Sequence, residues 1–188
     1  MNRQKISTHA SFLTLGCILS LAALLITLNM QPRRNPGSSQ ITAVMEEIRG
    51  AFPNVPTITP HELNRMLEEK QTLRLIDVRT GDEFYMSHLR GAQLPALLEE
   101  ITAETSPTKT VLYCSVGWRS AIMADSMIES GVHNVFNLAG GIFYWTQLGY
   151  PIYREGKETN QVHPYNATWS DLLPEQFHPK TFSPIEES

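Results

Sequence analysis

The stretch VLYCSVGWRS, residues 111–120, constrains the fold of this chain more than any other part of the sequence. Residues 111–113 are largely apolar and predict the end of a short buried strand, while residues 121–129 repeat apolar side chains at the spacing of a helix. Cys114 is therefore expected at a turn from a strand into a helix. At such a turn the first backbone N–H groups of the helix have no partner within the helix, and the helix dipole is positive.

This turn has the composition of an anion-binding loop. Gly117 permits the backbone angles that point successive N–H groups at an anion, and Arg119 adds a permanent positive charge. Both features favour a thiolate over a thiol at Cys114. A lone cysteine is more often a small buried packing residue, but a packing position needs neither the glycine nor the arginine that follow here. We therefore hypothesise that Cys114 is a nucleophile.

Strands and helices alternate along the central part of the chain. The hydrophobic pattern predicts strands near residue 58 and at residues 73–78, 109–113 and 133–138, and helices at residues 60–70, 81–87, 96–101, 121–129 and 142–148. This alternation predicts an α/β fold with a mainly parallel sheet covered by helices on both faces. In such sheets the functional site lies at the carboxyl ends of the strands, and Cys114 follows one of these ends.

The amino-terminal segment predicts a membrane anchor. Residues 10–28 form an uncharged apolar run, which as a helix would be roughly 28 Å long, close to the hydrocarbon thickness of a bilayer. The run is long for a signal peptide, and no small-residue cleavage pattern follows it. We expect a single-pass anchor with the domain on the non-cytoplasmic side; the alternative is a cleaved signal that leaves a secreted or periplasmic protein.

The composition of the remaining segments predicts how the chain is divided into regions. The charge and the residue spacing also limit which classes of partner it can bind. We expect a membrane anchor or signal segment at residues 1–30, a linker with a short helix (41–49) at 31–54, the α/β domain at 55–152, and an extended tail at 153–188, anchored by the rings of Tyr165 and Trp169. The formal net charge of −4, without a basic tract, argues against nucleic acid as a partner. The two cysteines and six histidines show no metal-ligand spacing, so we expect no metal.

Several short motifs together resemble one family. They are Asp77-Val78-Arg79, Glu83-Phe84, His88, Gly91-Ala92, residues 114–120 and residues 140–145. In this order, over residues 56–152, the chain resembles the single-domain rhodanese-like sulfurtransferases. The chain departs from the family pattern at Ser87, where glycine is usual, and at Gln93, where asparagine is usual.

The resemblance implies a fold and an activity. The fold would be a compact α/β domain with a five-stranded, mostly parallel sheet, and Cys114 would carry a sulfane sulfur as a persulfide. The loop after Cys114 would hold the persulfide or the anionic end of a donor, through Ser115, Val116, Gly117, Trp118 and Arg119.

Four further motif residues, Asp77, Arg79, Glu83 and His88, are expected to support the loop. We expect an ion pair between Arg79 and Glu83, hydrogen bonds from loop N–H groups to Asp77, and a scaffold role for His88. Trp145 is expected in the core. Arg119 is expected to bind the donor; alternatively it pairs with Asp77 or Glu83 and holds the loop closed.

The predicted reaction is sulfur transfer from a thiosulfate-like donor to a thiol or protein acceptor through Cys114, without a cofactor. One alternative is a non-catalytic binding or regulatory module. Another is a cysteine phosphatase or arsenate reductase, but such phosphatases usually place one more residue between the cysteine and the arginine than the four between Cys114 and Arg119.

Overall fold

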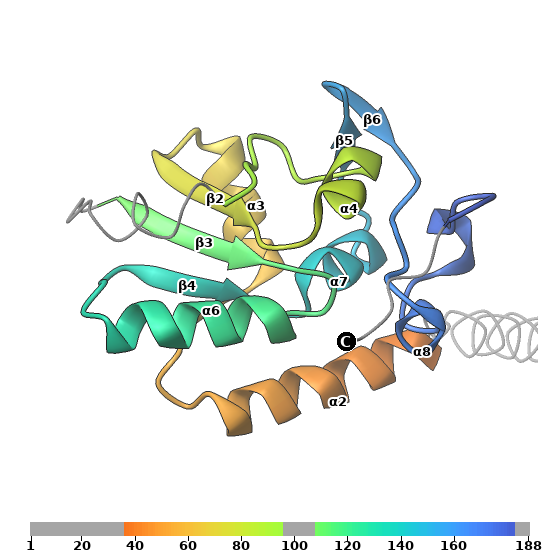
Figure 1. The fold of residues 1–188 in the computed structure, drawn as a ribbon. Coiled ribbons are helices and arrows are strands. Elements are labelled where there is room, and N and C mark those ends of the chain that lie inside the picture. The colour runs from red at the N-terminus through yellow and green to blue at the C-terminus, as the bar shows by residue number, and fades with distance from the viewer. Residues whose placement is uncertain (1–35, 96–107, 183–188) are drawn as a thin grey trace, which may run out of the picture. The chain divides into compact units, whose positions relative to one another are not determined.

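The computed structural model describes residues 36–95 and 108–182 (Figure 1). The chain divides into two compact units, Met1–Arg34 and Asn35–Ser188, and all of the described residues belong to the second. In the described part of the chain, no helix is both long enough and apolar enough to cross a membrane.

Two predicted elements lie outside the described residues. They are the membrane anchor at residues 10–28 and the helix at residues 96–101. Both stay predictions from the sequence.

A parallel sheet forms the centre of the domain (Figure 1). Its strands are β1 (Thr57–Ile58), β2 (Leu73–Asp77), β3 (Lys109–Tyr113) and β4 (Val135–Leu138), in the spatial order β1-β4-β3-β2. All three strand pairs are parallel. The prediction of a parallel α/β sheet is therefore confirmed.

The expected fifth strand is reduced to a single residue among those described. Gln93 forms a parallel bridge with Ile76 at the outer edge of β2, accepting from the N–H of Asp77 and donating to the carbonyl of Leu75. Pro95 follows two residues later and has no N–H to donate, which limits further pairing along this edge.

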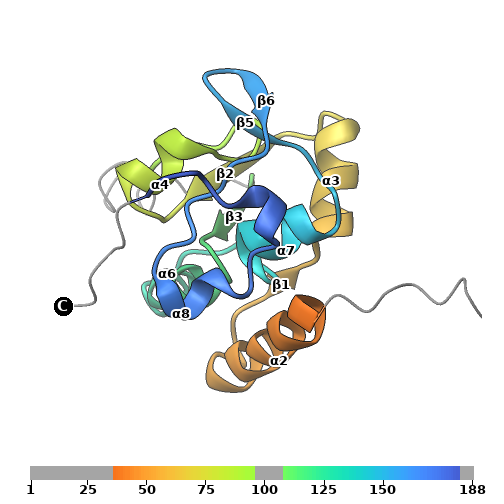
Figure 2. The same ribbon diagram turned by 90° about the vertical axis from the view of Figure 1, so that its right-hand side faces the viewer.

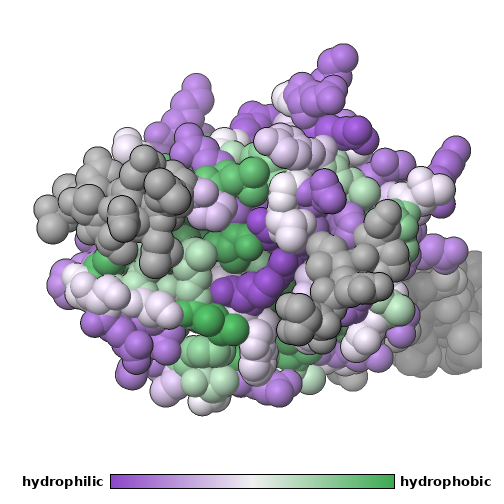
Figure 3. All heavy atoms as spheres, in the orientation of Figure 1, coloured by the Kyte–Doolittle hydropathy of each residue, from purple (hydrophilic) through white to green (hydrophobic). Residues whose placement is uncertain are grey.

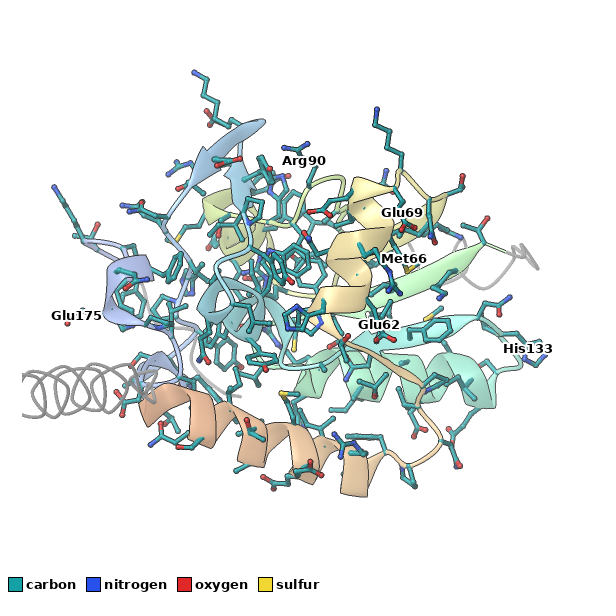
Figure 4. The ribbon with its side chains drawn as sticks, turned by 180° about the vertical axis from the view of Figure 1, so that it is seen from behind. Glu62, Met66, Glu69, Arg90, His133 and Glu175 are labelled. Atoms are coloured by element: carbon teal, nitrogen blue, oxygen red, sulfur yellow. The ribbon has the colours of Figure 1, made fainter. Side chains whose placement is uncertain are left out.

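Helices cover both faces of the sheet. On one face Ile76, Leu112 and Val135 pack with Ala124 and Met127 of α6 (Trp118–Glu129). The opposite face packs against α3 (Pro60–Glu68) and α7 (Gly141–Gln147). Figure 4, which shows the molecule from behind, has α3 and its Met66 in front of the sheet. The alternation of strand side chains between two apolar layers explains why the strands are almost continuously hydrophobic.

Two helices begin with the same capping arrangement. At α3 the Thr59 backbone N–H donates to the Glu62 carboxylate, and the Glu62 N–H donates to the Thr59 hydroxyl, which is the capping box formed by a threonine and a glutamate three residues later. The helix α4 (Gly81–Met86) repeats this pattern with Thr80 and Glu83. The second capping box directs the carboxylate of Glu83 back toward the amino end of α4.

The helix before the domain is longer than predicted. The helix α2 spans Pro36–Ala51, whereas the sequence indicates a linker with a helix only at residues 41–49. Proline suits the first helical turn, so the helix can begin inside the proline-containing linker. Ile41 and Ile48 on this helix are buried, so α2 packs as part of the domain.

The tail is not simply extended. It contains an antiparallel hairpin of β5 (Ile152–Arg154) and β6 (Lys157–Thr159), the short helix α8 (Ala167–Ser170) and the 3₁₀ turn η1 (Glu175–Phe177). Glu155 and Gly156 both have positive φ, as in a two-residue type I′ turn, which explains the hairpin. Figure 2 shows the tail crossing in front of α6 and α7.

The start of α7 fixes the loop that follows β3. The N–H groups of Ile142 and Phe143 donate to the carbonyls of Cys114 (2.9 Å) and Ser115 (3.0 Å). Gly141, with φ of +55°, lies directly against this loop: an added Cβ would clash with the carbonyl oxygen of Cys114 and lie 2.6 Å from that of Ser115. Only glycine permits this approach.

We predict that Gly141→Ala destabilises the domain much more than Gly149→Ala. Gly149 also has positive φ (+78°), but an added Cβ there meets nothing within 4 Å, so its substitution costs only the strain of a left-handed alanine, about 1 kcal/mol. Gly141→Ala adds the backbone clash and should cost at least about 2 kcal/mol more. Urea unfolding measures both. Equal losses of stability would show that the close approach at Gly141 is unimportant.

Candidate active site

Cys114 lies where β3 ends and the turn into α6 begins, as predicted. Its side chain is buried, with 1% exposed, and the backbone N–H of Gly117 donates to its sulfur at 3.1 Å. Gly117 is the residue before α6 and has φ of +103°, a conformation that favours glycine. The sulfur is thus held by a backbone donor at the amino end of a helix.

Of the five predicted loop residues, four line a pocket beside the sulfur and one donates a hydrogen bond to it. Ser115, Val116, Trp118 and Arg119 line a pocket of about 120 Å³ together with Cys114. Gly117 instead holds the sulfur through its N–H. The structure therefore brings together all five residues that the resemblance implied.

Asn137 fixes the loop from the neighbouring strand, and the sequence analysis missed it. Its amide nitrogen donates to the carbonyl of Gly117 (3.0 Å), and its amide oxygen accepts from the hydroxyl of Ser120 (2.7 Å). Asn137 is 3% exposed. The available signal was a polar residue within the otherwise apolar strand VFNL, because a buried amide needs hydrogen-bond partners.

Glu83 pairs with Arg119 and not with Arg79. The two Nη atoms of Arg119 donate to the two carboxylate oxygens of Glu83, at 2.9 and 2.7 Å. The predicted Arg79–Glu83 ion pair is wrong, since the capping box directs Glu83 toward the amino end of α4, where Arg119 reaches it. The alternative in which Arg119 pairs with Glu83 is the arrangement observed.

Ser115 joins this pair to the cysteine loop. Its hydroxyl donates to Glu83 at 3.0 Å and accepts from Arg119 at 3.1 Å. The carboxylate of Glu83 thus accepts hydrogen bonds from Ser115 of the loop, from Arg119 of α6 and from the cap residue Thr80. One buried acid connects α4 to the turn that carries Cys114.

The electrostatics of the pair favour its charged form. Burial would raise the pKa of Glu83, but hydrogen bonds from Arg119 and the charges of Arg119 and Arg79 outweigh burial and hold this pKa at about 2. Burial would lower the pKa of Arg119, whereas the hydrogen bond with Glu83 and the charges of Cys114 and Glu83 raise it overall. Both side chains are therefore ionised at neutral pH.

Arg79 and Asp77 form a separate ion pair beneath the loop. Both side chains are fully buried, and Arg79 donates from Nε and Nη2 to the Asp77 carboxylate at 2.8 and 2.6 Å. Asp77 was predicted to accept from N–H groups of the neighbouring loop; instead it accepts the backbone N–H of Arg79. Arg79 also donates to the carbonyl of Ser87. Arg79 therefore connects the end of β2 to Ser87, the residue after α4.

His88 and Trp145 make contacts with the surrounding scaffold. A ring nitrogen of His88 lies 3.1 Å from the carbonyl of Phe84, and the two rings are stacked at 4.2 Å. Trp145 is 2% exposed, and its indole N–H donates to the carbonyl of Pro151. Neither side chain lines the pocket at Cys114.

The tail supplies part of the pocket wall, which the sequence analysis did not foresee. Tyr165 and Trp169 line the same pocket as Cys114, and the Arg119 guanidinium lies 4.6 Å from the centre of the Tyr165 ring. Both residues were expected only to anchor the tail. On the face of the molecule shown in Figure 3, hydrophilic and hydrophobic residues lie next to one another.

Comparisons with known proteins agree with this geometry. The family described as "Rhodanese-like domain" matches residues 59–148. A "Sulfurtransferase" of Allochromatium vinosum is 33% identical over 101 residues, which cover 52% of this chain and 94% of that protein. The "Probable adenylyltransferase/sulfurtransferase MoeZ" of Mycobacterium tuberculosis is 32% identical over 133 residues, and the match covers 63% of this chain and 34% of MoeZ. This chain thus spans about a third of the length of MoeZ.

A solved structure shows the same fold. The thiosulfate sulfurtransferase of Pseudomonas aeruginosa superposes with a TM-score of 0.51 at 20% identity, over 62% of this chain and 23% of that one.

We predict that Glu83 makes stability depend on pH in the acid range. A carboxyl with an ordinary pKa of 4.5 in the unfolded chain and about 2 in the folded chain stabilises the fold above pH 4.5 and ceases to do so as the pH falls toward 2. The loss should be on the order of 3 kcal/mol. Glu83→Gln should be less stable at neutral pH and should lose this part of the pH dependence, as measured by urea unfolding at several pH values.

The matched control is Glu62→Gln, which removes an exposed acid from the same kind of capping box without an arginine pair. It should leave the acid-range loss of stability close to that of the wild type. If the two glutamate variants behaved alike, the Glu83–Arg119 pair would not be the source of the pH dependence.

Proposed function

Because the chain belongs to the rhodanese-like family, we propose that it is a sulfurtransferase in which Cys114 carries the transferred sulfur as a persulfide. The observation that carries this proposal is the position of the Cys114 sulfur: at the carboxyl end of β3, beside a pocket, and bound by the N–H of Gly117 at the start of α6. A backbone donor and a helix dipole at this point stabilise negative charge on sulfur.

The reaction would proceed in two steps. In the first, the Cys114 thiolate attacks the outer sulfur of a sulfane donor; an S–S bond to Cys114 forms, the S–S bond of the donor breaks, and the leaving group departs with the electron pair. With thiosulfate the leaving group would be sulfite. In the second step, a thiolate acceptor attacks the outer sulfur of the persulfide and regenerates the Cys114 thiolate. Such a covalent intermediate gives ping-pong kinetics.

The residues around Cys114 have distinct roles in this proposal. Gly117 holds the reacting sulfur, and Asn137 fixes the carbonyl of Gly117 so that the loop keeps its shape. Ser115 and Glu83 position Arg119 at the pocket wall. Because the loop is bound by both β4 and α7, the nucleophile is held in place before the donor arrives.

We predict that Cys114→Ser abolishes sulfur transfer. The purified full chain is incubated with a sulfane donor and digested, and mass spectrometry then locates any added sulfur. The wild type should carry one extra sulfur on the peptide containing Cys114, and a subsequent thiol acceptor should remove it. The oxygen of serine cannot form a persulfide, so Cys114→Ser should show neither labelling nor turnover.

The matched control is Cys17→Ser, which removes the only other cysteine of the chain. It should retain both the labelling and the turnover of the wild type. Full turnover in Cys114→Ser would mean that the chain does not use this cysteine as the sulfur carrier.

We also propose that residues 10–28 anchor the chain in a membrane, with the domain on the non-cytoplasmic side. The support for the anchor is the length of the uncharged apolar run, which has basic residues at both ends, Arg3 and Lys5 before it and Arg33 and Arg34 after it. The anchor would confine sulfur transfer to the membrane surface.

Membrane fractionation tests the anchor. The full chain should stay with membranes through a high-salt wash, because burial of an apolar helix does not depend on ionic strength. A chain that begins at Asn35, the start of the second compact unit, should be released as a folded protein. Release of the intact full chain by salt would contradict an integral anchor.

A further inference from the structure

The C-terminal tail is bound firmly to the domain and lies beyond the residues that the family match covers. Val162, Leu172 and Leu173 are buried in the main core. The side-chain amide of Gln147 on α7 donates to the carbonyl of Leu172 at 2.7 Å. The position of the tail is therefore set by apolar burial and by hydrogen bonds that do not involve the pocket.

Local backbone structure then directs two tail rings to the pocket. Tyr165 has φ of +69°, which is unfavourable for an aromatic residue, and its N–H donates to a ring nitrogen of the buried His163. Trp169 lies in α8, where its N–H donates to the side chain of Asn166. Strained backbone of this kind persists where the surrounding structure holds it, and it often marks functional sites.

The charge at the pocket is already balanced. Arg119 is the only basic residue among the described residues that line the pocket, and both of its Nη atoms donate to Glu83. The Tyr165 ring lies over its guanidinium. An inorganic dianion such as thiosulfate would have to share this cation with a buried, ionised carboxylate, which is unfavourable in a site of low dielectric.

The shape and chemistry of the pocket suit an apolar group instead. Trp118, Tyr165 and Trp169 are each partly exposed, and Val116 completes an apolar wall next to the sulfur of Cys114. Aromatic rings stabilise a bound apolar group because contact between them removes apolar surface from water and allows favourable ring contacts. The volume of about 120 Å³ is below the ~300–1,000 Å³ of sites for drug-sized ligands, so the enclosed group is small.

Resting on the proposed sulfurtransferase activity, we propose that Tyr165 and Trp169 determine donor specificity: with Trp118 they bind the small apolar group R of an organic persulfide, R–S–SH. The Cys114 thiolate attacks the outer sulfur, the Sγ–S bond forms, the bond between the two donor sulfurs breaks, and the thiolate R–S⁻ leaves with the electron pair. The proton of the persulfide passes to this thiolate, giving R–SH and the Cys114 persulfide anion. No external oxidant or reductant takes part.

The test compares two donors on the purified full chain with cyanide as the common acceptor. The donors are benzyl persulfide, generated in the assay, and thiosulfate. For the wild type, kcat/KM for benzyl persulfide should exceed that for thiosulfate at least tenfold. Trp169→Ala and Tyr165→Ala should each reduce this ratio about tenfold, mainly through KM for benzyl persulfide.

The ratio of the two kcat/KM values does not change when a variant folds incompletely, because a smaller active fraction lowers kcat/KM for both donors by the same factor. Trp169→Phe, which keeps a ring in the wall, should restore most of the preference. The matched control is Tyr85→Ala, which removes a ring that is 67% exposed and outside the pocket; it should keep the wild-type ratio.

The outcomes separate the two proposals. Labelling of Cys114 by both donors, with thiosulfate equal to or better than benzyl persulfide, overturns the specificity proposal and leaves the sulfurtransferase proposal intact. A wild-type ratio in both Trp169→Ala and Tyr165→Ala overturns the role of the tail. If neither donor places sulfur on Cys114, the sulfurtransferase proposal is contradicted and the specificity proposal falls with it.

Discussion

The buried carboxylate of Glu83 is the interaction on which the arrangement of this site depends. It caps α4 through Thr80, accepts the hydroxyl of Ser115 and receives both Nη atoms of Arg119. A buried charge is tolerated only when partners replace the lost water, and here each partner comes from a different segment. The hydrogen bonds that this carboxylate needs therefore bring together the segment after β2, the loop after β3 and the start of α6.

A balanced ion pair next to the proposed nucleophile sets the charge of the pocket. Arg119 and Glu83 are both charged, yet together they present little net charge to the pocket. The remaining stabilisation of a sulfur anion comes from Gly117 and from the amino end of α6. Charge stabilisation is thus concentrated at the sulfur itself, while the rest of the wall is largely aromatic.

The local features of this fold were readable from the sequence, whereas contacts between distant segments were not. The strand-to-helix turn at Cys114 and the capping box at Thr59 follow from residue types at short spacing, and the structure has both. The sequence analysis paired Glu83 with Arg79 and not with Arg119. The direction in which the Glu83 carboxylate points depends on how α4 packs against α6, which short sequence spacing does not reveal. The tail was described as extended because it has no hydrophobic period. Its pocket residues lie about fifty positions beyond Cys114, and only tertiary packing brings them to the sulfur.

The origin of the pocket wall in the tail has a consequence for the order in which the protein matures. During synthesis the amino-terminal parts of a chain emerge first, so the whole sheet, the Cys114 loop and α7 are available before Tyr165 and Trp169. A partly synthesised chain that stops before Tyr165 would have Cys114 and Trp118 in place without the two rings that the tail adds to the pocket wall. Under the proposed specificity, the chain therefore gains its cysteine loop before the two rings that select the donor.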